Sequence, residues 1–191
     1  LATAPADGGA PLELELHGET SPLAVVGGAP ALLLVSSSAT FENNNGRDRL
    51  IAFVDQLALA ASDPAGAPRR RGIVLRPRQP RRETFWLGAI SHEQARGALA
   101  RLATELFGAV HAYFFPCEAV LGWRKKKEPR PELTGYIHTL RDSDWKTHFT
   151  SDWGPVPKAT GYPPPATEAE ALRLAEARFG LYFETVEEDE A

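Results

Sequence analysis

The residues that come closest to a catalytic pattern are Glu132, Asp144 and Lys146. Glu132 is followed twelve residues later by the tripeptide Asp144-Trp145-Lys146. In metal-dependent nucleases, carboxylates of this kind hold a divalent cation while a lysine orients the attacking water. Short acid-x-Lys patterns also arise by chance in polar loops, so a metal-dependent nuclease is kept as a minor alternative.

Other residues capable of chemistry lack the neighbours that a reaction needs. Cys117 is the single cysteine, and a lone cysteine in an apolar stretch is more often a packing residue than a nucleophile. His138 and His148 stand apart from any regular ligand spacing. The chain also has no serine elbow, phosphate loop or dinucleotide fingerprint. We therefore expect no catalytic residue, no metal and no cofactor.

The strongest charge asymmetry is an arginine-rich block from Arg69 to Arg82. Seven of its fourteen residues are arginine and none is acidic, although the whole chain has a formal net charge of -4. Such a block needs an anionic partner or acids from its own fold. Residues 1–68 and 167–191 each hold eight acids against two arginines. One interpretation is that the acidic ends lie across the basic middle and neutralise it.

Nucleic-acid binding through Arg69–Arg82 is the main alternative function. Arginine binds phosphate in bidentate fashion, and Phe85, Trp86 and Trp123 could stack bases beside the block. Two observations disfavour this function. The net charge is negative, and the apolar segment Ala31–Val35 has none of the aromatic residues that RNA-recognition strands display.

The absence of a catalytic pattern favours a non-catalytic protein-interaction module, such as an inhibitor, an immunity-type protein or an accessory subunit of an assembly. Residues 135–162 are rich in aromatic residues set among polar ones, which is typical of interfaces. We expect another protein as the partner and no membrane. The predicted binding residues are Arg76, Arg78, Arg81, Arg82, Trp86, Trp145 and Trp153.

Three helices are predicted from apolar spacing and capping residues. Two of them begin with a capping box, Ser91 with Gln94 and Thr167 with Glu170. The predicted helices are 47–61, 91–108 and 167–180.

Strand patterns fill much of the remaining chain. The predicted strands are 12–17, 31–35, a hairpin of 71–76 and 84–90 with its turn at 77–82, 109–115, 118–123, 134–140 and 181–186. The order strand, helix, strand, strand, helix, strand predicts an α+β fold with a ferredoxin-like, split βαβ core from about 31 to 115. Two to three helices would cover one face of an antiparallel sheet, and a C-terminal extension would add to it.

Length and composition are those of one globular domain. The chain has 191 residues, 43% of them hydrophobic and 24% charged, which fits a domain over residues 1–186 followed by a disordered acidic tail at 187–191. No apolar run reaches the roughly 18 residues of a spanning helix, so we expect a cytoplasmic protein. The chain contains no methionine, which predicts that sequence precedes Leu1 and leaves a targeting segment open.

Overall fold

The computed structural model describes residues 2–3, 12–13, 15, 17–36, 45–76, 82–107, 115–142 and 163–188. Within these ranges the helices are α1 (Asn45–Ser62), α2 (His92–Phe107), α3 (Cys117–Arg124), α4 (Leu133–Asp142) and α5 (Glu168–Thr185). The strands are β1 (Ala2–Thr3), β2 (Leu12–Glu13), β3 (Leu23–Val26), β4 (Ala29–Val35), β5 (Arg70–Leu75), β6 (Glu83–Leu87) and β7 (Val186–Glu188). The predicted α+β class is therefore confirmed.

The main sheet is mixed, whereas the sequence predicted an antiparallel one. Its five strands lie in the order β3-β4-β5-β6-β7, and β4 pairs in parallel with β5 while the other neighbours are antiparallel. A split βαβ unit has another strand between its two parallel strands. Here β4 and β5 pair directly, with Leu33 opposite Ile73, so the ferredoxin-like core is not confirmed. Residues 109–114 of the predicted fourth core strand lie outside the described residues.

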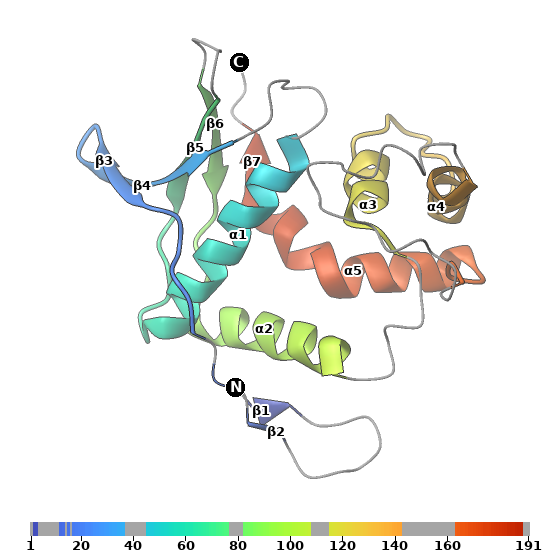
Figure 1. Ribbon diagram of the computed structural model, residues 1–191, viewed down its shortest axis with the longest axis horizontal. Helices are drawn as coiled ribbons and strands as arrows, with labels where there is room; N and C mark the ends of the chain where they lie inside the picture. Colours follow the sequence, from blue (N-terminus) through green and yellow to red (C-terminus); the bar gives the residue numbers. More distant parts are fainter. Residues whose placement is uncertain are drawn as a thin grey trace.

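Helix α1 connects the two parallel strands and covers one face of the sheet, which we call the inner face (Figure 1). Phe53 and Leu57 of α1 are buried against Leu32 of β4 and Phe85 of β6. Helix α2 packs on α1 and adds Ala95 and Ala98 to the same core. This core forms because α1 presents apolar residues at helical spacing and the strands present them at alternate positions.

The predicted capping box of α2 is confirmed. The backbone N–H of Gln94 donates to Ser91 Oγ at 3.1 Å, and the N–H of Ser91 donates to Gln94 Oε1 at 3.0 Å. At α5 the N–H of Glu170 donates to Thr167 Oγ1 at 3.2 Å. Both helices thus begin where the sequence predicted.

Three segments predicted as strands are helical, among them 181–186, of which residues 181–185 belong to α5. Residues 118–123 fall within α3 and 134–140 within α4, and both helices pack on α5 around a second core that includes Val120, Ile137 and Leu174. Short apolar runs do not distinguish strand from helix by period alone. The cap of α4 is also a tertiary contact, because the N–H groups of Leu133 and Thr134 donate to the carboxylate of Glu168 in α5.

The C-terminal segment differs from the prediction in two respects. Helix α5 continues past Gly180 to Thr185, where Tyr182 packs edge-on against Phe53 with ring centroids 5.5 Å apart. Residues Val186–Glu188 then form β7 beside β6, so the first two residues of the predicted acidic tail belong to a strand. Residues 189–191 lie outside the described part of the chain.

Among the described helices, none combines the length and the apolar character needed to cross a membrane.

Candidate functional site

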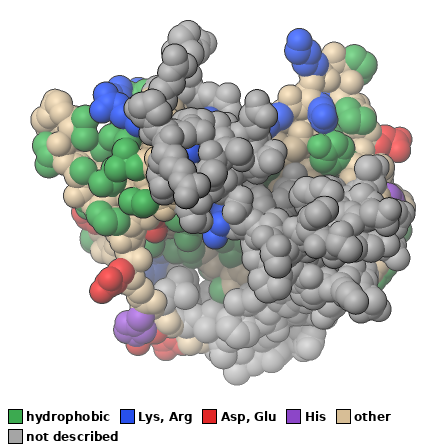
Figure 2. Space-filling view, turned by 45° about the horizontal axis from the view of Figure 1, so that its top comes forward, with side chains coloured by type: hydrophobic (Ala, Val, Ile, Leu, Met, Phe, Trp, Pro, Cys, Tyr) green, Lys and Arg blue, Asp and Glu red, His purple; other side chains and the backbone are tan. Residues whose placement is uncertain are grey.

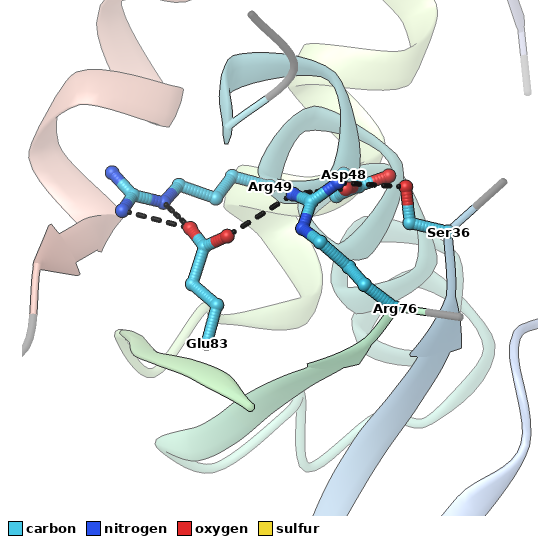
Figure 3. A network of polar contacts seen from close by, with 5 residues as sticks. All are labelled: Ser36, Asp48, Arg49, Arg76 and Glu83. Carbon is cyan, nitrogen blue, oxygen red and sulfur yellow. Dashed lines mark hydrogen bonds and ion pairs between the residues drawn. The ribbon is translucent and has the colours of Figure 1, made fainter. Parts of the chain in front are cut away.

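Arg76, one of the predicted binding residues, is enclosed within the protein at the end of β5. Its side chain is 0% exposed. One terminal nitrogen lies 2.9 Å from Asp48 Oδ2 and 3.2 Å from Glu83 Oε2, and the other donates to Ser36 Oγ at 3.0 Å (Figure 3). Arg76 was predicted to bind an acidic group of another protein. In the structure it lies in the interior, and its acidic partners are Asp48 and Glu83 of the same chain.

The strand order brings this network together. Ser36 follows β4 and Arg76 follows β5. Because the two strands are parallel, their carboxyl ends meet at one edge of the sheet. Helix α1 starts at the same edge and contributes Asp48 from its first turn. Glu83 opens β6, where it pairs with Val74 of β5.

Glu83 joins a second arginine to the network. Nε and one terminal nitrogen of Arg49 approach Glu83 Oε1 at 3.1 and 3.0 Å, while the other carboxylate oxygen of Glu83 faces Arg76. The side chains of Arg49 and Glu83 are only 10% and 9% exposed. Two arginines thus meet two carboxylates, and each buried charge has a counterion.

Burial dominates the electrostatics of Asp48. Loss of water around its carboxyl raises the pKa above the ordinary value of 3.8, which outweighs the opposing effects of the Ser36 hydrogen bond and the Arg76 charge. The nearby Glu83 carboxylate acts in the same direction as burial. Asp48 consequently holds a proton to a higher pH than an exposed aspartate does.

This network is better suited to structure than to catalysis. The carboxyl ends of parallel strands are a common place for ligand sites. Here, however, both Asp48 and Glu83 are engaged by arginines, so neither is available as a base or a metal ligand. Within the described residues there is also no group of three or more His, Cys, Asp or Glu side chains that could hold a metal ion. We interpret the network as a clamp that fixes the β5–β6 hairpin to α1.

The opposite, outer face of the sheet carries the exposed part of the arginine-rich block. Trp86 of β6 lies opposite Arg71 of β5 and Glu187 of β7. The guanidinium carbons of Arg69 and Arg71 stand 4.2 and 4.7 Å from the Trp86 ring centroid. Arg69 also pairs with Glu187 at 2.6 Å. Within the described residues, the acidic C-terminal segment therefore neutralises Arg69, through a half-exposed pair of the kind that contributes at most about 1 kcal/mol.

Three exposed residues lie side by side at the other end of the outer face. Val35 is 75% exposed and pairs in register with Leu75, which is 41% exposed. Arg82, which is exposed, directly precedes Glu83, the first residue of β6 and the partner of Val74. Alternation along the strands turns Val35 and Leu75 away from the inner face, where Leu34, Arg76 and Glu83 are enclosed. We call Val35, Leu75 and Arg82 the outer patch.

Several predicted residues cannot be placed. Arg78, Arg81, Trp145 and Trp153 lie outside the described residues, as do Asp144 and Lys146 of the nuclease pattern. Glu132 is described and is exposed just before α4.

No sequence pattern predicted that Arg76 would contact Ser36, Asp48 and Glu83, or that Arg49 would join them. Two local signals were present: Glu83 directly follows the arginine-rich block, and Asp48 lies in the first turn of a predicted helix. Neither observation reveals that the two acids converge on one arginine. Comparison of the chain with protein-family models, with curated proteins and with solved structures found no match.

Proposed function

We propose that this protein is a non-catalytic interaction module, such as an inhibitor or an accessory subunit, that binds an acidic surface of another protein. The outer patch is the observation that carries the proposal. Val35 and Leu75 expose adjacent apolar side chains, and Arg82 stands beside them with an exposed cation. An apolar centre with an arginine at its rim is the composition that protein interfaces favour.

Apolar side chains are also exposed on the neighbouring edge strand β3. Figure 2 shows hydrophobic side chains gathered at the left of the view, the side on which β3 and β4 lie. In β3, an edge strand, Leu23 and Val25 are 52% and 78% exposed. Leu23 pairs with Leu32, so the Leu23 and Val25 side chains lie on the inner side of the sheet, and they form an exposed apolar area apart from the outer patch.

The charges favour a protein partner over nucleic acid. The chain has a net charge of -4, and the arginine-rich block loses Arg76 to the internal network and shares Arg69 with Glu187. Few arginines of the described block then remain for phosphates, whereas one exposed arginine beside an apolar pair is sufficient for an interface rim.

The test is a triple variant with a matched control. In Val35→Thr/Leu75→Thr/Arg82→Thr the outer patch loses its apolar centre and its cation, and threonine suits the strands. The control, Val54→Thr/Leu172→Thr/Arg173→Thr, changes the same three residue types at exposed positions on α1 and α5. Each protein, immobilised through one terminus, is exposed to lysate and the captured proteins are identified. We expect one protein to be captured by the wild type and the control, and at least tenfold less of it by the outer-patch variant.

Three results would contradict the proposal. Equal capture by all three proteins would show that the outer patch is not the binding surface. No captured protein at all would leave the assignment without a partner. Salt-sensitive binding of an oligonucleotide that is lost in the outer-patch variant would replace a protein partner with nucleic acid.

A further inference from the structure

Strand β3 is an edge of the main sheet and forms a hairpin with β4 (Figure 1). Gly27 and Gly28, with φ of 61° and 82°, turn the chain between Val26 and Ala29. Positive φ at both central residues is what the tightest hairpin turns require. Along the described part of the chain, no strand pairs with the other side of β3. One side of this strand is therefore open to a further strand.

The hydrogen bonds of the hairpin determine which backbone groups face the open edge. The N–H of Leu33 donates to the carbonyl of Pro22 at 2.9 Å. In an antiparallel ladder, residues that bond to the partner strand alternate with residues that do not, so Ala24 also bonds to β4. Leu23 and Val25 are the alternate residues, and they direct their N–H and C=O groups to the open edge.

This edge has none of the usual protection. Edge strands commonly carry charged residues, an internal proline or a bulge, which prevent pairing with another chain. Strand β3 reads Leu-Ala-Val-Val and pairs with β4 without interruption, and no charged residue occurs between Ser21 and Ser36. Leu23 and Val25 also expose 52% and 78% of their surface. The edge thus combines open backbone groups with apolar side chains, which makes it a template for another strand.

The edge is complementary to a second copy of itself. In an antiparallel pairing centred on Ala24, Leu23 of each copy lies opposite Val25 of the other. These are the residues with outward N–H and C=O groups, so every one of those groups finds a partner. The two alanines meet as a non-hydrogen-bonded pair with Cα atoms about 4.5 Å apart, where a small side chain fits. The leucines and valines of both copies then form one apolar cluster on the inner side of the sheet.

Charge and symmetry also favour a second copy. Each chain has a net charge of -4, which disfavours contact between two copies over most surfaces. The uncharged segment between Ser21 and Ser36 is a place where two copies meet without like charges in contact. Pairing of one edge with its own copy is a closed twofold contact, the commonest kind among protein oligomers.

We propose that two copies of this protein associate through β3, in the antiparallel register centred on Ala24, to form one continuous sheet. The strand has four residues, so the contact is small, and small interfaces are typical of weak, reversible complexes. The contact shares no residue with the outer patch. The two proposals are therefore tested separately.

Sedimentation equilibrium of the full chain over a range of concentrations measures the association. We expect a reversible monomer–dimer equilibrium in the wild type. Val25→Lys should raise the dimer Kd about tenfold or more, because it removes the apolar contact with Leu23 of the other copy and places a charge at the edge. The matched control is Val54→Lys, at a valine of α1 that is 44% exposed. Its Kd should equal that of the wild type.

Cross-linking tests the register. In a Cys117→Ala background, Ala24→Cys places two thiols across the twofold axis, in a pair whose Cβ atoms are about 4.5–5.5 Å apart. This separation is close to that in disulfides, so mild oxidation should produce covalent dimers. The matched control is Ala29→Cys in the same background, which puts an exposed thiol on β4. Because that thiol is away from the axis, it should give at least about tenfold less covalent dimer.

Four outcomes would overturn the proposal. The wild type could remain monomeric at every concentration, or form a dimer whose Kd is unchanged by Val25→Lys. Ala24→Cys could cross-link no better than Ala29→Cys. A monomeric wild type that captures from lysate a protein lost in Val25→Lys would assign the edge to a strand of another protein. Circular dichroism shows that each variant is folded, and the two cysteine variants retain the test if Val25→Lys perturbs the hairpin.

Discussion

Arg76 and Arg82 belong to the same arginine-rich block but have opposite surroundings. Arg76 has a fully buried side chain that contacts Asp48, Glu83 and Ser36, whereas Arg82 is exposed. Removing one partner of a buried ion pair strongly destabilises a protein, because the remaining charge stays buried without a counterion. A surface arginine remains hydrated whether or not it has a partner. Residue type alone therefore does not determine the role of an arginine here.

This contrast predicts different effects on stability. Arg76→Ala should lower the free energy of unfolding by about 3–5 kcal/mol, because Asp48 and Glu83 would lose their shared cation. Arg82→Ala should change it by less than about 0.5 kcal/mol. Urea-induced unfolding followed by circular dichroism measures both. Similar values for the two variants would show that Arg76 is not held by the internal network.

Asp48 predicts a pH dependence. Burial raises its pKa above 3.8 in the folded protein, so the folded state binds this proton more tightly than the unfolded state does. The resulting stabilisation is complete below pH 3.8 and is lost as the pH rises through the raised value. Asp48→Asn removes this titration. The unfolding free energy of the wild type minus that of Asp48→Asn should therefore fall as the pH rises above about 3.8. A constant difference, or one that rises with pH, would contradict the assignment.

At the scale of elements, the β5–β6 hairpin depends on a close contact between its strands. Gly72 lies opposite Phe85 on the inner face, and a Cβ at Gly72 would collide with the Phe85 ring. Phe85 is fully buried and is part of the main core, so it has no free space into which to move. Position 72 therefore requires glycine, because any larger residue would not fit against the Phe85 ring.

The corresponding test compares two glycines. Gly72→Ala should lower the free energy of unfolding by about 1–3 kcal/mol through overpacking. Gly97→Ala, in α2, meets nothing within 4 Å and should raise it by about 0.5–1 kcal/mol, since alanine is the better helix former. Chemical denaturation distinguishes the two. If Gly72→Ala is neutral, the Phe85 ring does not occupy the place above the glycine.

At the scale of the whole molecule, the described residues form two apolar cores that share α5. One core lies between the sheet, α1 and α2, and the other among α3, α4 and α5. Leu50 of α1 and Phe183 of α5 pack against both cores. The Arg178–Glu105 pair, at 2.6 Å, adds a polar link between α5 and α2.

The sequence by itself determined the elements whose pattern is long or capped. Helices α1, α2 and α5, the apolar strand β4 and the β5–β6 hairpin follow from apolar spacing and from the side chains of Ser91, Gln94 and Thr167. These signals act between neighbours along the chain, so they can be recognised without knowing the fold. The short runs that became α3 and α4 carried no such signal, and the cap of α4 comes from Glu168 in another helix.

Only the tertiary structure decided which charges meet. The direct parallel pairing of β4 with β5 brings Ser36 to Arg76, which lies 40 residues later. The same edge of the sheet receives Asp48 from α1 and Glu83 from β6. Charge pairing depends on distance in space and on the loss of water, and neither quantity is encoded in the local composition of a segment. The arginine-rich block was evident from the sequence, whereas its division into the buried Arg76 and the exposed Arg82 was not.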